Sequence, residues 1–382
     1  MVGLLNAQDS KAVKKKFINA GGWEINVSGN FNASYVLTLP ENNGSLIDGG
    51  LTYVDSEKAV SSVQNGLLPA SLTVTSSYTT EEDVKLSLTV GAYYGLVTAP
   101  NGGTYALDNS TLDLRQFFLQ ISKKELGTFT LGRNFGLFGF DAIINDASLL
   151  GVGVVLAPKN PVNTTLGGIG FGYVYADRLT QINYSTPIHK GFTATVGIYQ
   201  ALDYRPLFIS NSDAVAHSPS APGMQGKLNY TSGKVQLSSA FLSQKNDDFS
   251  SFGWDVFGKV KLSKVLSLTG YYSIGEGLGS AILFTDAGIN GKGRSSYNYY
   301  TQATASFSKN TFSLYYGVSG LDKTAFDNDN LLKTNQRVSL FYSRAIAKPL
   351  LLTAGVNLAS SKNHLGETNK ATNVNVGVFV SF

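Results

Sequence analysis

The chain of 382 residues contains no cysteine, two methionines, two tryptophans and three histidines. Without cysteine it can form neither a disulfide framework nor a thiolate metal site. The histidines, His189, His217 and His364, fall far apart in predicted turns or loops, with no Ser/His/Asp spacing around them. We therefore expect no catalytic residues, no metal site and no cofactor, and we do not expect an enzyme.

Charge and long apolar runs are also scarce. Only 15% of the residues are charged, and the formal net charge of +4 is dispersed along the chain, which argues against a nucleic-acid partner. No run of roughly 18 apolar residues occurs, so the sequence predicts no transmembrane helix. Helical periodicity is nearly absent, which leaves an all-β fold as the prediction.

What the chain does have is alternation between apolar and polar residues, from Trp23 to Phe382. In Trp23–Thr38 the alternation persists over about 15 residues, whereas a strand of a soluble protein averages about 5–6. A tilted strand needs about 9–11 residues to cross the hydrocarbon of a membrane. The length of the alternating segments therefore indicates strands that span a membrane.

The alternating segments are joined by short turns on one side and long loops on the other. This asymmetry is typical of an outer-membrane barrel; a propeller would show a repeated blade motif of about 40–50 residues, and none occurs. We predict a transmembrane antiparallel β-barrel of about 16 strands, with short periplasmic turns and long extracellular loops. The predicted strands are Trp23–Thr38, Leu67–Ser77, Val84–Leu96, Leu112–Ser122, Thr128–Asn134, Leu179–Thr186, Phe192–Leu202, Gly223–Tyr230, Val235–Ser243, Phe252–Leu262, Val265–Ile274, Ser296–Phe307, Thr311–Ser319, Gln336–Ala345, Leu350–Ala359 and Thr372–Phe382.

The chain divides into two predicted parts. Residues 1–22 are polar, with a basic run at Lys14–Lys16, and are predicted to be an N-terminal periplasmic tail or short helix outside the barrel. A disordered terminus is the alternative. Residues 23–382 form the barrel. Within it, the segment 135–178 is far longer than a hairpin turn requires and is mostly uncharged. We expect this third loop to fold inward and constrict the barrel.

The two faces of the predicted strands differ in polarity. A polar face repeated on successive strands cannot be a dry core, because many polar groups would be unsatisfied; it should line a wet lumen. The apolar face should then meet lipid, with Tyr35, Tyr184, Tyr230 and Tyr342 in aromatic girdles. The orientation of Leu112–Asn134 is open, because two sets of residues compete for the outer face. They are Phe117, Leu119 and Ile121 against Leu112, Leu114 and Phe118.

At this point the chain resembles the sixteen-stranded trimeric porins of Gram-negative outer membranes. The segment Gly127–Gly136 (GTFTLGRNFG) resembles the porin strand that leads into the constriction loop, and the chain ends in an alternating apolar strand with a terminal Phe382. The resemblance implies an outer-membrane location, a homotrimer, contact with outer-membrane lipid and lipopolysaccharide, and a pore for small hydrophilic solutes. Gly136–Gly139 and Ile169–Asp177 also resemble porins linked to dicarboxylate uptake.

We expect the pore to prefer anions mildly, because its predicted lining is more positive than negative. The resemblance implies that Arg133 lies at the constriction, and the loop carries only two acids before residue 147, Asp141 and Asp146. The predicted pore-lining residues are Arg133, Lys85, Arg337, Lys227, Lys259, Asp141, Asp146 and Lys159. The main alternative is a substrate-specific outer-membrane transporter or receptor with a defined binding site.

Overall fold

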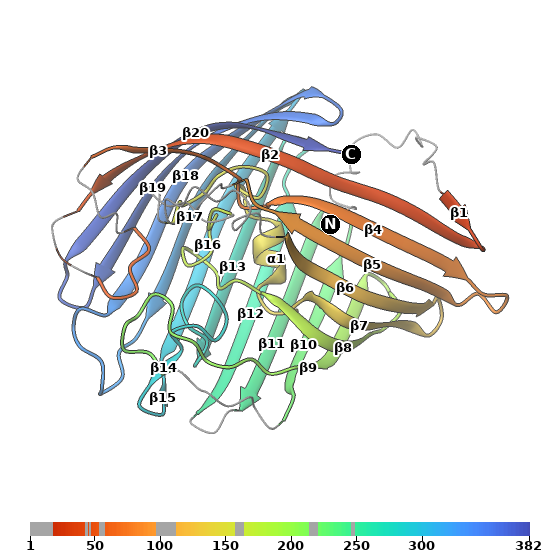
Figure 1. The fold of residues 1–382 in the computed structure, drawn as a ribbon, viewed down its shortest axis with the longest axis horizontal. Helices are drawn as coiled ribbons and strands as arrows, with labels where there is room; N and C mark the ends of the chain where they lie inside the picture. Colours follow the sequence, from red (N-terminus) through yellow and green to blue (C-terminus); the bar gives the residue numbers. More distant parts are fainter. Residues whose placement is uncertain are drawn as a thin grey trace.

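A computed structural model of the chain describes residues 18–42, 45, 47–52, 58–96, 112–156, 164–213, 221–245 and 249–382. Sixteen long strands form one closed antiparallel sheet, which surrounds a central space (Figure 1). The barrel closes where β2 pairs with β20, in a register that runs from Asn30 opposite Ser381 to Glu41 opposite Lys370. The predicted fold is confirmed.

The wall strands follow one another around the barrel in sequence order. They are β2 (Trp23–Glu41), β4 (Ala70–Thr79), β5 (Lys85–Tyr94), β6 (Leu112–Lys123), β7 (Gly127–Phe135), β8 (Arg178–Ser185), β9 (Phe192–Tyr199), β10 (Gly223–Thr231), β11 (Val235–Lys245), β12 (Ser250–Lys261), β13 (Leu266–Glu276), β16 (Ser295–Phe307), β17 (Asn310–Leu321), β18 (Leu332–Ala347), β19 (Leu350–Asn363) and β20 (Thr368–Ser381).

Five shorter elements complete the fold. β3 (Val60–Gln64) pairs with the upper part of β2, and β14 (Gly288–Ile289) and β15 (Lys292–Gly293) form a hairpin within a loop. The helix α1 (Phe140–Ile144) lies inside the barrel (Figure 1). Of the predicted tail, residues 1–17 lie outside the described part of the chain, and β1 (Ile18–Ala20) pairs with the start of β2. No described helix is long and apolar enough to cross a membrane.

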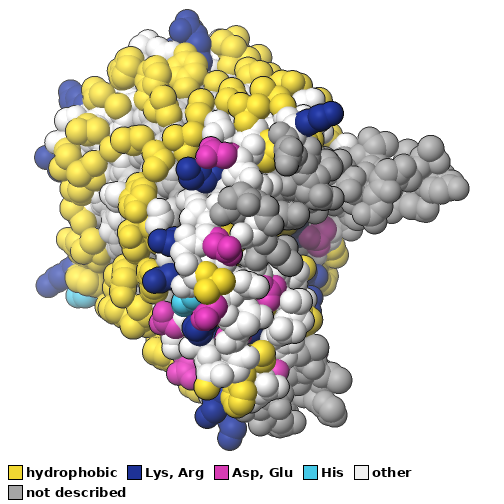
Figure 2. All heavy atoms as spheres, turned by 90° about the vertical axis from the view of Figure 1, so that its left-hand side faces the viewer, with side chains coloured by type: hydrophobic (Ala, Val, Ile, Leu, Met, Phe, Trp, Pro, Cys, Tyr) yellow, Lys and Arg dark blue, Asp and Glu magenta, His cyan; other side chains and the backbone are white. Residues whose placement is uncertain are grey.

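The outer face of the barrel is apolar. Figure 2 shows a broad hydrophobic band over the wall, while charged side chains cluster on another part of the same view. Next to the short turns, aromatic pairs stand across neighbouring strands, such as Phe129–Tyr184 and Phe192–Tyr230, with ring centroids 5.0 and 4.6 Å apart. Aromatic residues in this position form the girdle that is expected where the wall passes from the hydrocarbon to the lipid headgroups.

A β-bulge in β6 determines which of its side chains face outward, a question that the sequence left open. The β5–β6 register shifts at Gly91 and Ala92, so that Arg115 has no partner of its own. Leu114 is therefore exposed on the outer face, and so is Phe117 beyond the bulge, whereas Phe118 is buried. Each of the two competing alternatives is right on part of the strand, because an extra residue reverses the alternation between them.

The interior of the barrel is largely occupied by loops. The β7–β8 loop contributes Ile143, Ile169 and Phe171 to a buried apolar cluster with the inward-facing wall residues Phe257 and Tyr271. A second cluster joins the β9–β10 and β13–β16 loops, through Tyr204 and Phe284 among others. The predicted inward path of the third loop is therefore the path that the structure shows.

Candidate pore constriction

The third loop begins with a turn that is held by a wall carboxylate. Gly139 has a φ of 72°, in the left-handed region where glycine is favoured. Its N–H donates a hydrogen bond of 2.7 Å to Asp255 Oδ2 of β12, and the other carboxylate oxygen of Asp255 accepts one of 2.9 Å from the Ala240 N–H. Asp255 thus joins the loop to two adjacent strands at the residue where α1 begins.

Two predicted pore residues, Lys227 and Asp141, pair with each other. The Lys227 Nζ atom lies 2.7 Å from Asp141 Oδ2, and both side chains are more than nine-tenths buried. Ser238 donates a further hydrogen bond to the same carboxylate. Asn145 lies four residues after Asp141, and its Oδ1 accepts a hydrogen bond of 2.9 Å from Lys259 Nζ. These two lysines therefore hold the loop against β10 and β12.

A second buried pair joins Arg337 of β18 to Asp146 of the loop. Arg337 Nη2 lies 3.2 Å from Asp146 Oδ1, and neither side chain has any exposed surface in its charged part. Burial by itself would raise the pKa of Asp146, but the charge of Arg337 and the hydrogen bonds from Ser148 and Tyr173 outweigh it, so the pKa is lowered. The charge of Arg337 is directed at the loop and not at water.

Stacked tyrosines on the inner wall support the same loop. The rings of Tyr271, Tyr300 and Tyr315 lie 5.8 and 5.0 Å apart in succession, and all three are buried. Tyr300 donates its hydroxyl hydrogen bond to the Ala142 carbonyl, and Tyr315 to the Phe171 carbonyl, each at 3.1 Å. The loop is thereby packed against β13–β18 on one side of the barrel.

On the opposite side, the wall itself bends inward to meet the loop. Between β3 and β4, residues 65–69 leave the ladder, and the Leu67 N–H donates to the Gly151 carbonyl at 2.8 Å. The Asn32 side chain fills the gap in the ladder, donating to the Leu68 carbonyl and accepting from the Gly66 N–H at 2.7 and 2.8 Å. The predicted strand Leu67–Ser77 therefore starts only at Ala70, because the preceding backbone bonds to the loop.

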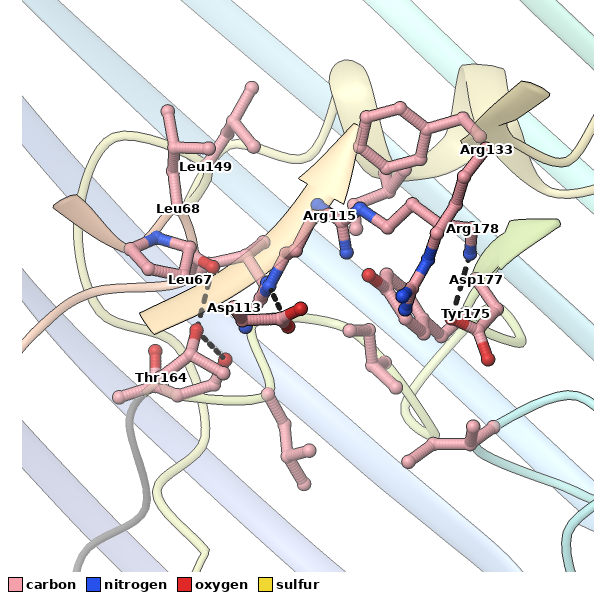
Figure 3. Close-up of a pocket in the computed structure, with 17 residues that line it drawn as sticks. Leu67, Leu68, Asp113, Arg115, Arg133, Leu149, Thr164, Tyr175, Asp177 and Arg178 are labelled. Carbon is pink, nitrogen blue, oxygen red and sulfur yellow. Dashed lines mark hydrogen bonds and ion pairs between the residues drawn. The ribbon is translucent and has the colours of Figure 1, made fainter. Parts of the chain in front are cut away.

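A cavity of about 200 Å³ remains between the loop and the wall of β4–β8. Three arginines line it, Arg115 of β6, Arg133 of β7 and Arg178 of β8, and Figure 3 shows their side chains entering the same space. Two acids, Asp113 and Asp177, line it as well. The opposite lining is apolar and includes Leu67, Leu149, Leu166 and Ile169.

The three arginines differ in their partners. Arg115 Nε donates to Asp113 Oδ2 at 2.7 Å, and the guanidinium carbon lies 5.2 Å from the centre of the Tyr93 ring. Arg178 is 8% exposed and lies 4.3 Å from the centre of the Phe135 ring. Its Nε has no hydrogen-bond partner among the described groups. A guanidinium held by aromatic rings in this way keeps hydrogen-bond donors available for an anion.

Arg133 is exposed and forms no ion pair with a described acid. Its partners across the sheet, Phe117 and Thr180, are exposed on the outer face. At this strand end the arginine side chain nevertheless lines the cavity, beside Tyr175 (Figure 3). The structure thus brings Arg133 together with two arginines that the sequence did not single out.

Asp177 ends the third loop at the edge of the cavity, with a left-handed φ of 51°. Its carboxylate accepts a hydrogen bond of 2.7 Å from the Arg178 N–H. Burial raises the pKa of Asp177 above its ordinary value, although the nearby charges of Arg205, Arg133 and Arg115 act in the opposite direction. This acid therefore takes up a proton more readily than an exposed aspartate.

The remaining predicted site residues lie elsewhere. Lys85 is exposed at the first position of β5, opposite Thr79 and beside a short turn, and Lys159 lies outside the described residues. Arg115 was missed because its orientation depends on the bulge. The competing outer-face assignments of Leu114 and Phe117 were the sequence signal of that change in alternation. Arg178 follows directly after the long loop, which is a position that could have drawn attention to it. No cluster of described residues could hold a metal ion.

A closed sixteen-stranded barrel with an apolar outer face and an inward loop defines the class of outer-membrane channels. The comparisons with known proteins agree. The sequence profile of the Gram-negative porin family matches residues 42–364, and the chain belongs to this family. It is accordingly a non-enzymatic diffusion channel of the bacterial outer membrane. No curated protein sequence matches the chain.

Solved porin structures share the fold at low sequence identity. The outer-membrane channel DcaP of Acinetobacter baumannii is 14% identical with a TM-score of 0.71, over 96% of this chain and 99% of that chain. An anion-selective porin from Comamonas acidovorans is 13% identical with a TM-score of 0.63, over 94% and 100%. OmpF of Salmonella typhi, in complex with daunomycin, is 13% identical with a TM-score of 0.61, over 96% and 100%.

Proposed function

We propose that the protein is a diffusion porin with a mild preference for small anions, dicarboxylates among them. The observation that carries the proposal is the cavity lined by Arg115, Arg133 and Arg178 against Asp113 and Asp177, which leaves one positive charge in excess. A narrow passage with low-dielectric walls concentrates the effect of such an excess on permeating ions.

Four other charges at the constriction cancel in pairs. Lys227 is paired with Asp141, and Arg337 with Asp146, and all four side chains are buried. They contribute to the shape of the loop and little to the field that a permeating ion meets. The principal source of selectivity is therefore Arg133, which the sequence predicted, together with Arg115 and Arg178, in place of Lys227 and Arg337.

The arrangement of the arginines also suits a solute with two carboxylates. Arginine binds a carboxylate through two parallel N–H groups, and Arg178 and Arg133 approach the same space from adjacent strands. A porin of Comamonas acidovorans with a similar fold is described as anion-selective, which supports the same direction of preference here. A substrate-specific transporter would instead require a solute that binds in the cavity and blocks ion current.

We propose further that the channel is a homotrimer that contacts lipopolysaccharide. The strands β7, β8 and β9 have 9, 8 and 8 residues, whereas β18, β19 and β20 have 16, 14 and 14. A wall that is low on one side is suited to contact with sister subunits, and the taller wall to contact with the lipid of both leaflets. Native mass spectrometry in detergent tests this, with three times the 40.8 kDa chain mass expected.

The decisive experiment is the reversal potential of the purified channel in a planar bilayer with a KCl gradient. We expect a potential that favours Cl⁻, and we expect Arg133→Ala to reduce it, because Arg133 is the exposed arginine of the cavity. Lys309→Gln is the matched control, since Lys309 is exposed in a short turn away from the cavity. A wild-type channel that favours K⁺ would contradict the anion preference and leave the porin fold unaffected.

A further inference from the structure

Five consecutive short turns of the barrel carry basic residues and no acidic ones. They are the β8–β9, β10–β11, β12–β13, β16–β17 and β18–β19 turns with the strand ends beside them. We call their cations the basic rim, and all of them are exposed. The basic rim consists of Lys190, Lys234, Lys261, Lys264, Lys309, Arg344 and Lys348.

Among the residues that the structure describes, the acids at this end of the barrel are confined to the other arc. The β4–β5 turn contains Glu81, Glu82 and Asp83, and the β6–β7 turn contains Glu125 beside Lys123 and Lys124. The chain as a whole is nearly balanced, with 30 basic and 26 acidic residues. The basic rim is therefore a local segregation of charge and does not follow from the overall composition.

No member of the basic rim forms an ion pair with a described acid. Seven exposed cations along one arc repel one another unless an anionic partner lies against them. A partner that matches them must carry many negative charges along a curved line that follows the barrel wall. The phosphate groups of a lipid leaflet have this arrangement, because the leaflet surrounds the wall.

The aromatic girdle lies directly beside these turns on the outer face. The rings of Phe192 and Tyr230 lie 4.6 Å apart, and those of Phe312 and Tyr342 lie 4.8 Å apart. Tyrosine is enriched at the level of lipid headgroups, so the girdle sets the depth at which phosphates are found. Figure 2 shows single Lys and Arg side chains standing at the margin of the hydrophobic band.

Arg344 connects the girdle to the basic rim. Asn310 Oδ1 accepts hydrogen bonds from Arg344 Nη1 at 3.3 Å and from the Tyr342 hydroxyl at 2.8 Å. Arg344 shares the outer face of β18 with Leu340, which is 52% exposed. Its charged end therefore lies at the boundary between hydrocarbon and headgroups, where a long basic side chain reaches toward phosphate.

We propose that the basic rim binds the phosphate groups of anionic phospholipids in the periplasmic leaflet of the outer membrane. The proposal concerns lipid contact and is independent of the ion preference of the pore. It predicts an anionic lipid shell along β10–β19, outside the low wall of β7–β9 that we assign to contact with sister subunits. No shell of comparable strength is expected along β4–β7, where the turns carry acids.

Tryptophan quenching by brominated lipids tests the proposal on the folded protein in vesicles. The first reporter is Phe312→Trp in a background of Trp23→Phe and Trp254→Phe, because Phe312 lies in the girdle beside Lys309. The second reporter retains Trp23 and carries only Trp254→Phe, since Trp23 packs against Tyr78 beside the acidic turn. Each is measured in brominated phosphatidylglycerol and in brominated phosphatidylcholine.

At the Phe312→Trp reporter we expect a preference for phosphatidylglycerol of about fivefold, the ratio that corresponds to one cation near an anionic surface. At Trp23 the ratio should be close to one. Adding Lys309→Gln and Arg344→Gln should abolish the preference at the first reporter, whereas Lys123→Gln with Lys124→Gln should leave it unchanged. Equal ratios at the two reporters, or a preference that survives loss of the two cations, would overturn the proposal.

Discussion

Arg337 and Asp146 form an ion pair inside the barrel in which neither charged group reaches solvent. The arginine also lies 3.9 Å from the centre of the Tyr315 ring and donates to Ser148 Oγ at 3.1 Å. The pair links a wall strand to the middle of the third loop. Because removal of one partner would leave the other charge buried without compensation, the pair fixes the position of the loop.

The first prediction concerns this pair. Arg337→Leu should weaken the attachment of the loop by about 3–5 kcal/mol, because the Asp146 carboxylate is then buried alone. Single-channel recordings should show increased current noise and switching between levels. Adding Asp146→Asn to this variant should reduce the current noise and the switching again, since no uncompensated charge remains. Recordings of Arg337→Leu that match the wild type would show that other contacts suffice to hold the loop.

The second prediction separates the charge of Arg178 from its shape. Arg178→Gln should lower the Cl⁻/K⁺ permeability ratio by about threefold, as expected for the loss of one charge beside a narrow passage. Arg178→Lys keeps the charge and should keep most of the ratio, although it loses the planar contact with Phe135. Reversal potentials in a KCl gradient measure both. A ratio that falls equally in the two variants would show that geometry matters more than charge.

The third prediction is a dependence of selectivity on pH. The pKa of Asp177 is raised above its ordinary value, so this carboxylate is neutralised at a higher pH than an exposed aspartate as the solution is acidified. The cavity then loses a negative charge and retains its arginines, and the Cl⁻/K⁺ permeability ratio should rise as the pH falls through that pKa. In Asp177→Asn the higher ratio should already be present at neutral pH. A step that persists in Asp177→Asn must belong to another group.

The fourth prediction tests the close approach of the inward wall segment to the loop. A Cβ atom added at Gly66 would lie 2.2 Å from the Gly151 carbonyl oxygen, so the two backbones must separate. We expect Gly66→Ala to destabilise the barrel by about 1–3 kcal/mol, measured as a lower temperature of heat-induced unfolding on gels. Gly270→Ala is the control, because an added Cβ there has no neighbour within 4 Å. Equal unfolding temperatures for the two variants would argue against a tight contact at Gly66.

The strands of the wall were predictable because each is identified by the alternation of residues within its own segment. In Leu350–Ala359 and Thr372–Phe382, alternation alone identifies strands that pair from Leu350 opposite Val380 to Leu358 opposite Thr372. The prediction was wrong at Leu67–Pro69, which contain apolar residues at strand-like spacing but bond to the third loop. No local pattern distinguishes apolar residues that face lipid from those that face a loop folded into the same barrel.

The candidate site was harder to predict, because its charges are defined by pairs that lie far apart in sequence. Lys227 and Asp141 were each expected to line the pore, but together they form a buried ion pair. Conversely, Arg115 belongs to the cavity only because a bulge adds one residue to β6. Both outcomes depend on the path of the third loop and on register, which alternation in single strands does not determine.

The third loop is anchored mainly by strands that follow it in the chain. Its contacts at Lys227, Asp255, Tyr300 and Arg337 come from β10, β12, β16 and β18. The loop can therefore reach its final path only after these strands have entered the sheet. The width of the pore is therefore defined only when folding is complete. A barrel that stopped folding before its last strands paired would have a wall but no defined constriction.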